Sequence, residues 1–422
     1  MKRRVNERKA LLIDGPASIY LISGKAEVLG AEIKPEMKVV VRRGKRIPFE
    51  ALSECEAEIC VSEDGSCIEV DAPAIPSSWR VAVEEILSKK NSRSILIMGG
   101  VDSGKTSFSV YLANSALRRG WRIAVLDCDL GQSDLGPPGT ISLCFVDKQF
   151  TDLFTLFPDE SVFIGITSPS GVVDKVVKAA AKLKNVASSS GKNLLITNTD
   201  GWIEGEDAVE YKVKLIEALD PDCIVAIQAG GELEPIISSA GKRRVISVEP
   251  PEKARRRDQE IRRLLRGFAY KKHLKGSRTR TFPLKWIQVE GSLNLNSQVA
   301  ERLRERIEKI LGEEILYCEE KPRFILIVTE RNMHLDMERL RTAEAEIGKK
   351  IIALQKGDEK GILVSLEDRN EKMLGIGTIE SIDFRNGIVK VRTPVDKPVS
   401  KIKVGRIRLD PEGNEKEVFF RL

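Results

Sequence analysis

Histidine and cysteine are scarce in this sequence, and neither has the spacing that a metal site requires. The 422 residues include two histidines, His273 and His334, and seven cysteines without a C-x-x-C pair. Cys55, Cys60 and Cys67 form the one cysteine cluster, and a metal ion bound there would need a fourth ligand. We therefore interpret the cysteines as small, reduced side chains of the core.

Long hydrophobic runs are also lacking. No stretch of 18 apolar residues is present, which argues against a membrane-spanning helix. The basic N-terminus, residues 1–4, is not followed by an apolar segment of signal-peptide length. These absences predict a cytoplasmic protein with no membrane partner. The length and the 41% of hydrophobic residues predict about two to four domains with sizeable cores.

Positive charge is concentrated in one segment. The chain carries a net charge of +6, whereas residues 253–280 contain twelve Lys or Arg and only two acids, Asp258 and Glu260. Such a segment favours a polyanionic partner, although a solvated helix face is its ordinary interpretation.

A phosphate-binding loop is the most specific motif of the chain. Residues 99–106 read GGVDSGKT and match G-x-x-x-x-G-K-[ST]. The apolar run at 95–98 is typical of a buried strand, and residues 106–119 have helical spacing up to Gly120. Backbone N–H groups of such a loop bind an anion at the helix N-terminus.

This motif predicts a nucleotide site with ATP and Mg²⁺ as its cofactors. Lys105 is expected to contact the β- and γ-phosphates, and the Thr106 hydroxyl is expected to bind Mg²⁺. The residues expected to bind the nucleotide are Gly99, Gly100, Val101, Asp102, Ser103, Gly104, Lys105, Thr106 and Ser107.

Three parts of the chain differ in their pattern. Residues 1–76 contain short strand candidates, with a hairpin signal at 58–70, and predict a small β-sandwich or barrel. Residues 77–284 alternate strands and helices, which predicts a P-loop α/β core with a parallel sheet covered on both faces. Residues 285–422 predict a smaller α/β domain that is rich in strands, with a helix at 299–311. The core strands are expected at residues 95–98, 123–126, 162–166, 194–197, 224–227 and 245–248.

Two acids follow the strand at 123–126. Because ligands of parallel sheets bind at the carboxyl ends of the strands, Asp127 and Asp129 are expected to face the phosphate-binding loop. Their alternate spacing predicts that both carboxylates lie on one side. One is expected to hold Mg²⁺, and the other to accept the proton of a substrate hydroxyl. For Asp127, capping of a turn is an equally good interpretation.

Two further loops follow strands at the same edge. Thr167 and Ser168 suit a phosphate or a nucleic-acid backbone, but they suit the N-terminal cap of the following helix equally well. Trp202 suits stacking on a base, with packing in the core as the alternative.

The basic segment is expected to form a helix over residues 252–273. Arg255, Arg262 and Arg266 lie near one face of that helix. Because the helix follows the last core strand, the segment 252–280 is interpreted as a lid over the phosphates, where arginine stabilises a transferring phosphoryl group. A solvated surface helix is the alternative.

In this order, the motifs GGVDSGKT, DCDLGQSDLGPPGTISL, ITSPSG and NTDGWI and the arginine-rich segment resemble the archaeal form of the Clp1/Grc3 family of polynucleotide 5′-hydroxyl kinases. The three-part layout is similar to that family too. The resemblance implies that Lys105 and Thr106 bind the nucleotide phosphates and Mg²⁺. It also implies that Asp129 orients Mg²⁺ and activates the 5′-hydroxyl, and that Gln132 assists at the metal or phosphate.

The resemblance assigns two further groups of residues. Thr199, Gly201 and Trp202 match the family segment that holds the nucleic-acid end. Arg257 and Arg262 match its catalytic lid arginines.

We therefore predict an ATP-dependent kinase that phosphorylates the 5′-hydroxyl end of RNA, with DNA as a further candidate substrate and RNA-processing proteins as candidate partners. Two other functions stay open. A P-loop NTPase switch would release phosphate to water, and a nucleotide-bound scaffold of an RNA-processing assembly would bind ATP without either activity. The pairing of the Trp202 loop with the basic helix favours the kinase, because hydrolysis alone needs neither.

Overall fold

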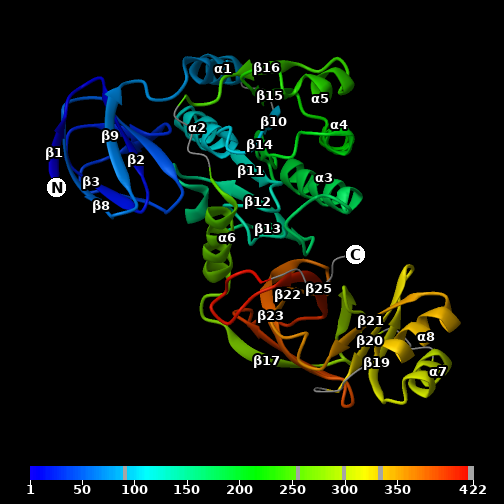
Figure 1. The fold of residues 1–422 in the computed structure, drawn as a ribbon. Coiled ribbons are helices and arrows are strands. Elements are labelled where there is room, and N and C mark those ends of the chain that lie inside the picture. The colour runs from blue at the N-terminus through cyan, green and yellow to red at the C-terminus, as the bar shows by residue number, and fades with distance from the viewer. Residues whose placement is uncertain (89–92, 253–256, 297–300, 331–335, 417–422) are drawn as a thin grey trace. The chain divides into compact units, whose positions relative to one another are not determined.

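The computed structural model describes residues 1–88, 93–252, 257–296, 301–330 and 336–416. The chain divides into two compact units, Met1–Ala269 and Tyr270–Leu422, and each is described by itself (Figure 1). The predicted domain boundaries near residues 76 and 284 stay predictions.

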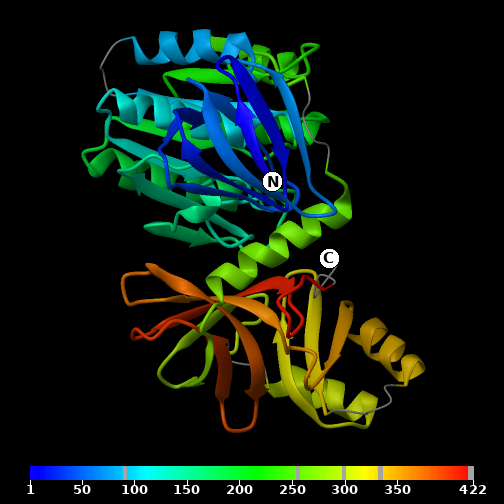
Figure 2. The ribbon, with the colours of Figure 1, turned by 90° about the vertical axis from the view of Figure 1, so that its left-hand side faces the viewer.

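The first unit begins with a sandwich of two antiparallel sheets. Its strands are β1 (Lys2–Val5), β2 (Lys9–Asp14), β3 (Ala17–Ser23), β4 (Ala26–Val28), β5 (Ala31–Ile33), β6 (Lys38–Val41), β7 (Arg46–Ala51), β8 (Cys55–Val61) and β9 (Ser66–Asp71). The sheets have the orders β1-β8-β3-β6 and β5-β4-β7-β2-β9. Alternating burial, as along β6, places one face of each strand on the core. Figure 2 shows these strands in blue.

The hairpin predicted at residues 58–70 is wrong. β8 pairs with β1 and β3, whereas β9 pairs with β2 in the other sheet. The turn between β8 and β9 therefore carries the chain across the sandwich. Gly65 is required there because a Cβ would lie 2.8 Å from Pro16 O. The cysteine cluster is likewise not wholly in the core, because Cys60 is exposed, while Cys55 is buried.

A seven-stranded sheet forms the P-loop core. Its strands are β10 (Arg93–Gly99), β11 (Ile123–Asp127), β12 (Thr140–Val146), β13 (Glu160–Phe163), β14 (Leu194–Asn198), β15 (Cys223–Ile227) and β16 (Val245–Val248). Its helices are α1 (Ser77–Leu87), α2 (Lys105–Arg118), α3 (Val173–Ser189), α4 (Glu206–Leu219) and α5 (Glu234–Ser239), with a 3₁₀ turn at Leu153–Thr155. The strand order is β13-β12-β11-β14-β10-β15-β16. α1 and α2 pack on one face and α3, α4 and α5 on the other (Figure 1).

The α/β fold class is confirmed, but the sheet is mixed. β11, β14, β10, β15 and β16 run parallel, as predicted. β12 was not predicted, and it runs antiparallel to β11 and β13. Residues 128–139 join β11 to β12 without a crossover helix, and such a connection returns the chain antiparallel. The strand predicted at 162–166 ends at Phe163, because the N–H groups of Ile164 and Gly165 both bond to Gly139 O.

The helix of the basic segment, α6 (Gln259–His273), begins later than predicted. Residues 253–256, with Arg255 and Arg256, lie outside the described residues. Asp258 ends the preceding segment, and its Oδ1 accepts a hydrogen bond from the Ile261 N–H at 2.7 Å, as an N-cap does.

The second unit contains a six-stranded sheet, β17-β24-β23-β22-β25-β18, and a three-stranded sheet, β19-β20-β21. Its elements are β17 (Arg278–Pro283), β18 (Gln288–Gly291), α7 (Glu301–Leu311), β19 (Ile315–Glu320), β20 (Phe324–Thr329), α8 (Met337–Ile347), β21 (Lys350–Gln355), β22 (Ile362–Glu367), β23 (Met373–Asp383), β24 (Ile388–Thr393) and β25 (Lys401–Arg408). The helix predicted at 299–311 is present from residue 301, and residues 299 and 300 lie outside the described ones. In the described ranges, no helix combines the length and the apolar character that crossing a membrane demands.

Candidate nucleotide and nucleic-acid site

The phosphate-binding loop joins β10 to α2 at the carboxyl edge of the sheet. Gly99 has no room for a side chain, because a Cβ would lie 2.5 Å from Ser103 Oγ and 2.8 Å from Ile227 O. Gly104 has a φ of 97° and directly precedes Lys105, the first residue of α2. A strand, a tight glycine turn and a helix N-terminus in this order form the arrangement that binds phosphate.

Lys105 is buried within this loop, with 7% of its surface exposed. Its Nζ donates hydrogen bonds to the carbonyl oxygens of Gly99 (3.0 Å) and Gly100 (2.6 Å). Burial lowers the pKa of Lys105 to about 8, and the nearby carboxylate of Asp129 opposes that shift. Because the loop carbonyls carry no full charge, an anionic ligand would satisfy this ammonium group better.

The remaining loop residues are more open. Val101 is exposed, and Thr106 and Ser107 are half-buried at the start of α2. Within the described chain the Thr106 hydroxyl has no recorded hydrogen bond, which leaves it available to a ligand.

Asp102 joins the basic segment to the phosphate-binding loop. Its φ is 59°, and its Oδ1 lies 3.0 Å from Arg257 Nε. Its Oδ2 accepts a hydrogen bond from the backbone N–H of Arg257 (2.9 Å) and lies 3.2 Å from a terminal nitrogen of Arg262. Both predicted lid arginines therefore lie beside the loop, although they contact a carboxylate of the chain itself.

The Asp127 carboxylate is buried, and both of its oxygens accept hydrogen bonds within the protein. It is 1% exposed, and its Oδ1 accepts hydrogen bonds from Asn198 Nδ2 (3.0 Å) and the Asp129 N–H (3.2 Å). Its Oδ2 accepts one from the Ser133 hydroxyl (3.0 Å). Burial raises the pKa of Asp127 to about 6, and the charge of Asp129 acts in the same direction. This carboxylate thus ties β11 to β14 and to the following loop.

Asp129 lies just beyond the strand, and only one of its oxygens is engaged. Oδ1 accepts hydrogen bonds from the N–H groups of Gly131 (3.0 Å) and Gln132 (2.8 Å). Within the described chain, no partner of Oδ2 is recorded. Burial raises the pKa of Asp129, as does the charge of Asp200, while Lys105 lowers it. The carboxylate is therefore held in place by one oxygen and presents the other.

Four buried polar oxygens at or next to this edge lack a hydrogen-bond partner within the described chain. They are Ser103 Oγ, Gln132 Oε1, Thr197 Oγ1 and Asn198 Oδ1. Gln132 is held by its amide nitrogen, which donates to Gly131 O at 2.9 Å. Buried oxygens without partners are costly, so a ligand that supplies donors or a cation would stabilise this edge of the sheet.

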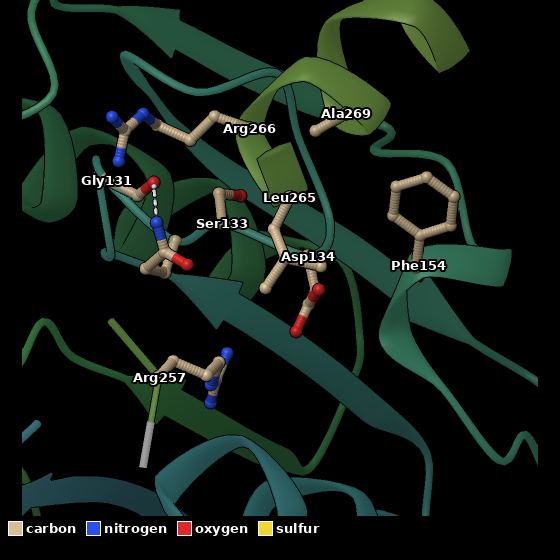
Figure 3. Close-up of a pocket in the computed structure, with 9 residues that line it drawn as sticks. Gly131, Ser133, Asp134, Phe154, Arg257, Leu265, Arg266 and Ala269 are labelled. Atoms are coloured by element: carbon tan, nitrogen blue, oxygen red, sulfur yellow. Dashed lines mark hydrogen bonds between the residues drawn. The ribbon is translucent and has the colours of Figure 1, made fainter. Parts of the chain in front are cut away.

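A small pocket lies between the loop of residues 128–139, the acid loop, and the basic segment at residues 257–269 (Figure 3). It holds about 10 Å³, room for one water molecule, and is lined by Gly131, Gln132, Ser133, Asp134, Phe154, Arg257, Leu265, Arg266 and Ala269. Figure 3 shows the side chains of Arg257 and Arg266 on opposite sides of the acid loop. The basic segment therefore packs closely on this loop.

The N-terminal sandwich anchors the acid loop at Asp134. Arg42 binds Asp134 at 2.8 Å and Asp152 at 2.7 Å, and Lys45 also binds Asp134. Burial disfavours the charge of Asp134, but the Lys45 and Arg42 cations hold its pKa well below its usual range. The Arg42 guanidinium also lies 3.9 Å from the centre of the Phe154 ring.

The loop after β14 lies against the phosphate-binding loop. A Cβ at Gly201 would lie 2.8 Å from Val101, so the two backbones touch. Thr199 is buried, and its hydroxyl donates to Ile97 O at 2.9 Å, which pins the loop to β10. Trp202 is half-buried and stacks on Tyr211 with a centroid separation of 5.8 Å.

A buried charged cluster that sequence reasoning missed supports this loop. Lys212 of α4 is 0% exposed, and its Nζ lies 3.0 Å from both Asp200 Oδ2 and Asp200 O. The Tyr211 hydroxyl donates to Asp200 Oδ2 at 2.7 Å, and the Trp202 N–H donates to Asp200 Oδ1 at 2.9 Å. The available signal was the position of Lys212 on the apolar stripe of α4, beside Ala208 and Leu215.

The loop before α3 reaches the same edge through its backbone. Thr167 O would lie 2.9 Å from a Cβ at Gly131, so this loop packs on the acid loop. Ser168 is exposed, and its hydroxyl accepts a hydrogen bond from the Ser170 N–H at 3.3 Å. α3 begins at Val173, and its N-cap residue, Val172, provides no side-chain cap, so the two hydroxyls do not cap this helix.

β10, its glycine-rich loop and α2 place the chain in the class of P-loop nucleotide-binding proteins. The family model for the P-loop of the mRNA cleavage and polyadenylation factor CLP1 matches residues 99–276. The chain is 31% identical over 360 residues to the polyribonucleotide 5′-hydroxyl-kinase of Pyrococcus abyssi, covering 81% of this chain and 94% of that one. It is 29% identical over 351 residues to that of Methanocaldococcus jannaschii, with the same coverage. The chain therefore belongs to the Clp1 family of polyribonucleotide 5′-hydroxyl kinases, and the predicted resemblance is confirmed.

Solved structures agree with the fold. Wild-type Clp1p in its complex with Pcf11p superposes with a TM-score of 0.69 at 14% identity, over 97% of each chain. This likeness confirms the fold of a Clp1 protein. Use of a nucleotide follows from membership of a P-loop kinase family.

Proposed function

We propose that the protein transfers the γ-phosphate of ATP to the 5′-hydroxyl end of RNA. One observation carries the proposal: the phosphate-binding loop, Asp129, the lid arginines and the Trp202 loop meet at one edge of one sheet. The relatives that cover most of the chain are named for this activity. DNA ends are a second substrate to test.

The nucleotide would lie on the phosphate-binding loop. Backbone N–H groups of residues 99–107 would surround the phosphates, and Lys105 would exchange its carbonyl partners for them. The residues also fit Mg²⁺. In the described ranges no three His, Cys, Asp or Glu side chains gather into a metal site. Mg²⁺ suits such a place because it takes one or two protein ligands together with phosphates and water. Thr106 and Asp129 would hold it, and it would neutralise phosphate charge.

Asp129 would accept the proton of the attacking hydroxyl. Its Oδ1 is fixed by two backbone N–H groups, which leaves Oδ2 to face the substrate. Burial raises its pKa, and a carboxylate with a raised pKa is a stronger proton acceptor.

Arg257 and Arg262 would stabilise the charge that spreads over the phosphoryl oxygens during transfer. Asp102 of the phosphate-binding loop contacts both arginines, so they already lie beside that loop. A triphosphate would therefore recruit two cations that are already close, which lowers the entropic cost of ordering them.

The RNA end would lie between three loops. We assign its binding to Gln132, to Thr167 and Ser168, and to the loop that contains Thr199, Gly201 and Trp202. In this loop, Thr199 acts by holding the backbone, since its hydroxyl is engaged with Ile97 O. Trp202 is half-buried and stacks on Tyr211, and the ring surface that Tyr211 leaves uncovered would stack on the terminal base. A Clp1 relative is known in complex with Pcf11p, so we also propose a protein partner from RNA processing.

The test uses γ-labelled ATP, Mg²⁺ and matched RNA oligonucleotides with 5′-hydroxyl or 5′-phosphate ends. The protein should label the 5′-hydroxyl RNA alone, Lys105→Ala should abolish labelling, and Asp129→Asn should lower kcat more than nucleotide affinity. Phosphate release to water without labelled RNA would replace the kinase with an NTPase, and tight ATP binding with neither product would replace it with a scaffold. Full turnover by Asp129→Asn would overturn the role of Asp129.

A further inference from the structure

The outer face of α3 carries a stripe of hydrogen-bond donors. Lys175, Lys178, Lys182, Asn185 and Ser189 are spaced by three or four residues, so they share one face, and all five are exposed. The opposite face of the helix is apolar and buried against the sheet. The stripe is thus presented to solvent by a helix that is itself firmly packed.

A shallow groove of about 830 Å³ runs beside this stripe. Lys178, Lys182, Asn185 and Val186 of α3 form one wall, and the half-buried ring of Phe145 on β12 lies against it. The groove therefore combines cations, neutral donors and one aromatic ring, which are the groups that single-stranded nucleic acids need for their phosphates and bases.

The lysines of the stripe differ from Lys214 of the adjacent helix in their ion pairs. Across the described residues, no ion pair is recorded for Lys175, Lys178 or Lys182. On the adjacent α4, by contrast, Lys214 lies 2.6 Å from Glu210 and 3.8 Å from Asp174. Three like charges on one helix face repel one another, and a polyanion would relieve that repulsion.

The stripe is continuous with the candidate site. α3 follows the Thr167 loop, which packs against the acid loop at Gly131. Because α3 leads into the parallel strand β14, its N-terminus lies at the carboxyl edge of the sheet and its C-terminus at the far edge (Figure 1). From Lys175 to Lys182 the helix rises about 10 Å, at 1.5 Å per residue. That length matches about three nucleotides of a stacked strand, at roughly 3.4 Å each.

We propose that this face of α3 binds the sugar–phosphate backbone of the RNA downstream of its 5′-terminal nucleotide, with a base against Phe145. The inference rests on the proposed function, because the 5′ end must lie at Asp129 for the strand to follow the helix. It predicts a substrate preference: RNA longer than a few nucleotides should bind more tightly than a short end.

The test compares two triple variants with equal charge change. One replaces Lys175, Lys178 and Lys182 by glutamine. The control replaces three exposed lysines of the N-terminal sandwich, Lys25, Lys34 and Lys38, by glutamine. Fluorescence anisotropy would measure binding of 5′-hydroxyl RNAs of three and twelve nucleotides between 0.05 and 0.5 M salt, and thermal unfolding would verify that each variant is folded.

For the wild type and the control variant we expect the twelve-mer to bind more tightly than the three-mer. In the α3 variant this ratio should fall toward one. Each neutralised phosphate contributes about −0.7 to the slope of log K against log salt for single strands, so the slope should become shallower by about 2. The corresponding loss of twelve-mer affinity is up to about 100-fold at 0.1 M salt.

An α3 variant that keeps the wild-type length ratio and salt slope would refute the inference, as would equal losses in the control variant. Labelling with γ-labelled ATP separates this failure from that of the proposed function. If the wild-type protein phosphorylates RNA and the α3 variant binds RNA as tightly as the wild type, the α3 site alone is refuted. A wild-type protein that phosphorylates no RNA refutes the kinase.

Discussion

Replacing Lys212 by methionine should strongly destabilise the first unit. The ammonium group is fully buried and pairs with the carboxylate and carbonyl of Asp200. Methionine fills similar space but leaves the Asp200 carboxylate buried with only the Tyr211 hydroxyl and the Trp202 N–H as partners. Removing one member of a buried ion pair costs about 3–5 kcal/mol. In a unit of this size, each kcal/mol corresponds to about 2 °C, so Tm should fall by roughly 6–10 °C.

Calorimetry of matched variants would measure this effect. Lys214→Met, two residues along α4 from Lys212, removes an exposed ammonium group and should change stability by less than about 0.5 kcal/mol. Adding Asp200→Asn to Lys212→Met removes the stranded charge, so the double variant should lose less than the sum of the single losses. KM for RNA should rise more than KM for ATP, because the cluster supports the Trp202 loop. A Lys212→Met protein within 1 °C of the wild type, or fully additive losses, would refute the reasoning.

Two further predictions concern pH. Because burial lowers the pKa of Lys105 to about 8, nucleotide binding above pH 8 should take up a proton and weaken as pH rises. Calorimetry at pH 8.5 in buffers of different ionisation enthalpy should detect this proton uptake. At pH 6.5 no uptake should be seen. Burial raises the pKa of Asp127 in the folded protein to about 6, above its ordinary value of 3.8. Its charge therefore costs stability above pH 6, and this cost disappears as pH falls toward 4. Asp127→Asn should therefore raise the free energy of unfolding at pH 7.5 by at most about 3 kcal/mol, with a higher Tm, and should give no gain at pH 4. An equal gain at pH 7.5 and pH 4 would contradict the raised pKa of Asp127.

Local motifs explain why much of the core could be predicted from the sequence. The run at 95–98, the glycines and the helix after Lys105 are adjacent in the chain, so their pattern contains the complete strand, loop and helix. The five parallel strands are short apolar runs between turns, and burial under helices on both faces selects that composition. The position of Asp129 after β11 follows from the same rule.

The features that escaped prediction depend on partners far apart in the chain. Asp102 meets Arg257 across 155 positions, and nothing in either segment specifies the other. Lys212 is one cation on an apolar helix face, and its burial depends on Asp200 in a loop that precedes the helix. β12 has a strand composition, but its direction depends on the loop that precedes it. The turn at Gly65 has hairpin residues, yet the sandwich core decides which strands pair.

Arg42 pairs with Asp134 and Asp152, and Lys45 pairs with Asp134; these ion pairs limit how the chain can be divided into working fragments. A fragment that starts at residue 77 would keep both carboxylates but lose both cations, and one of these carboxylates, Asp134, lies in the same loop as Asp129. Uncompensated carboxylates would draw water into that loop and loosen it. The N-terminal sandwich therefore supplies the cations that hold the acid loop in place, so a minimal working fragment must include it.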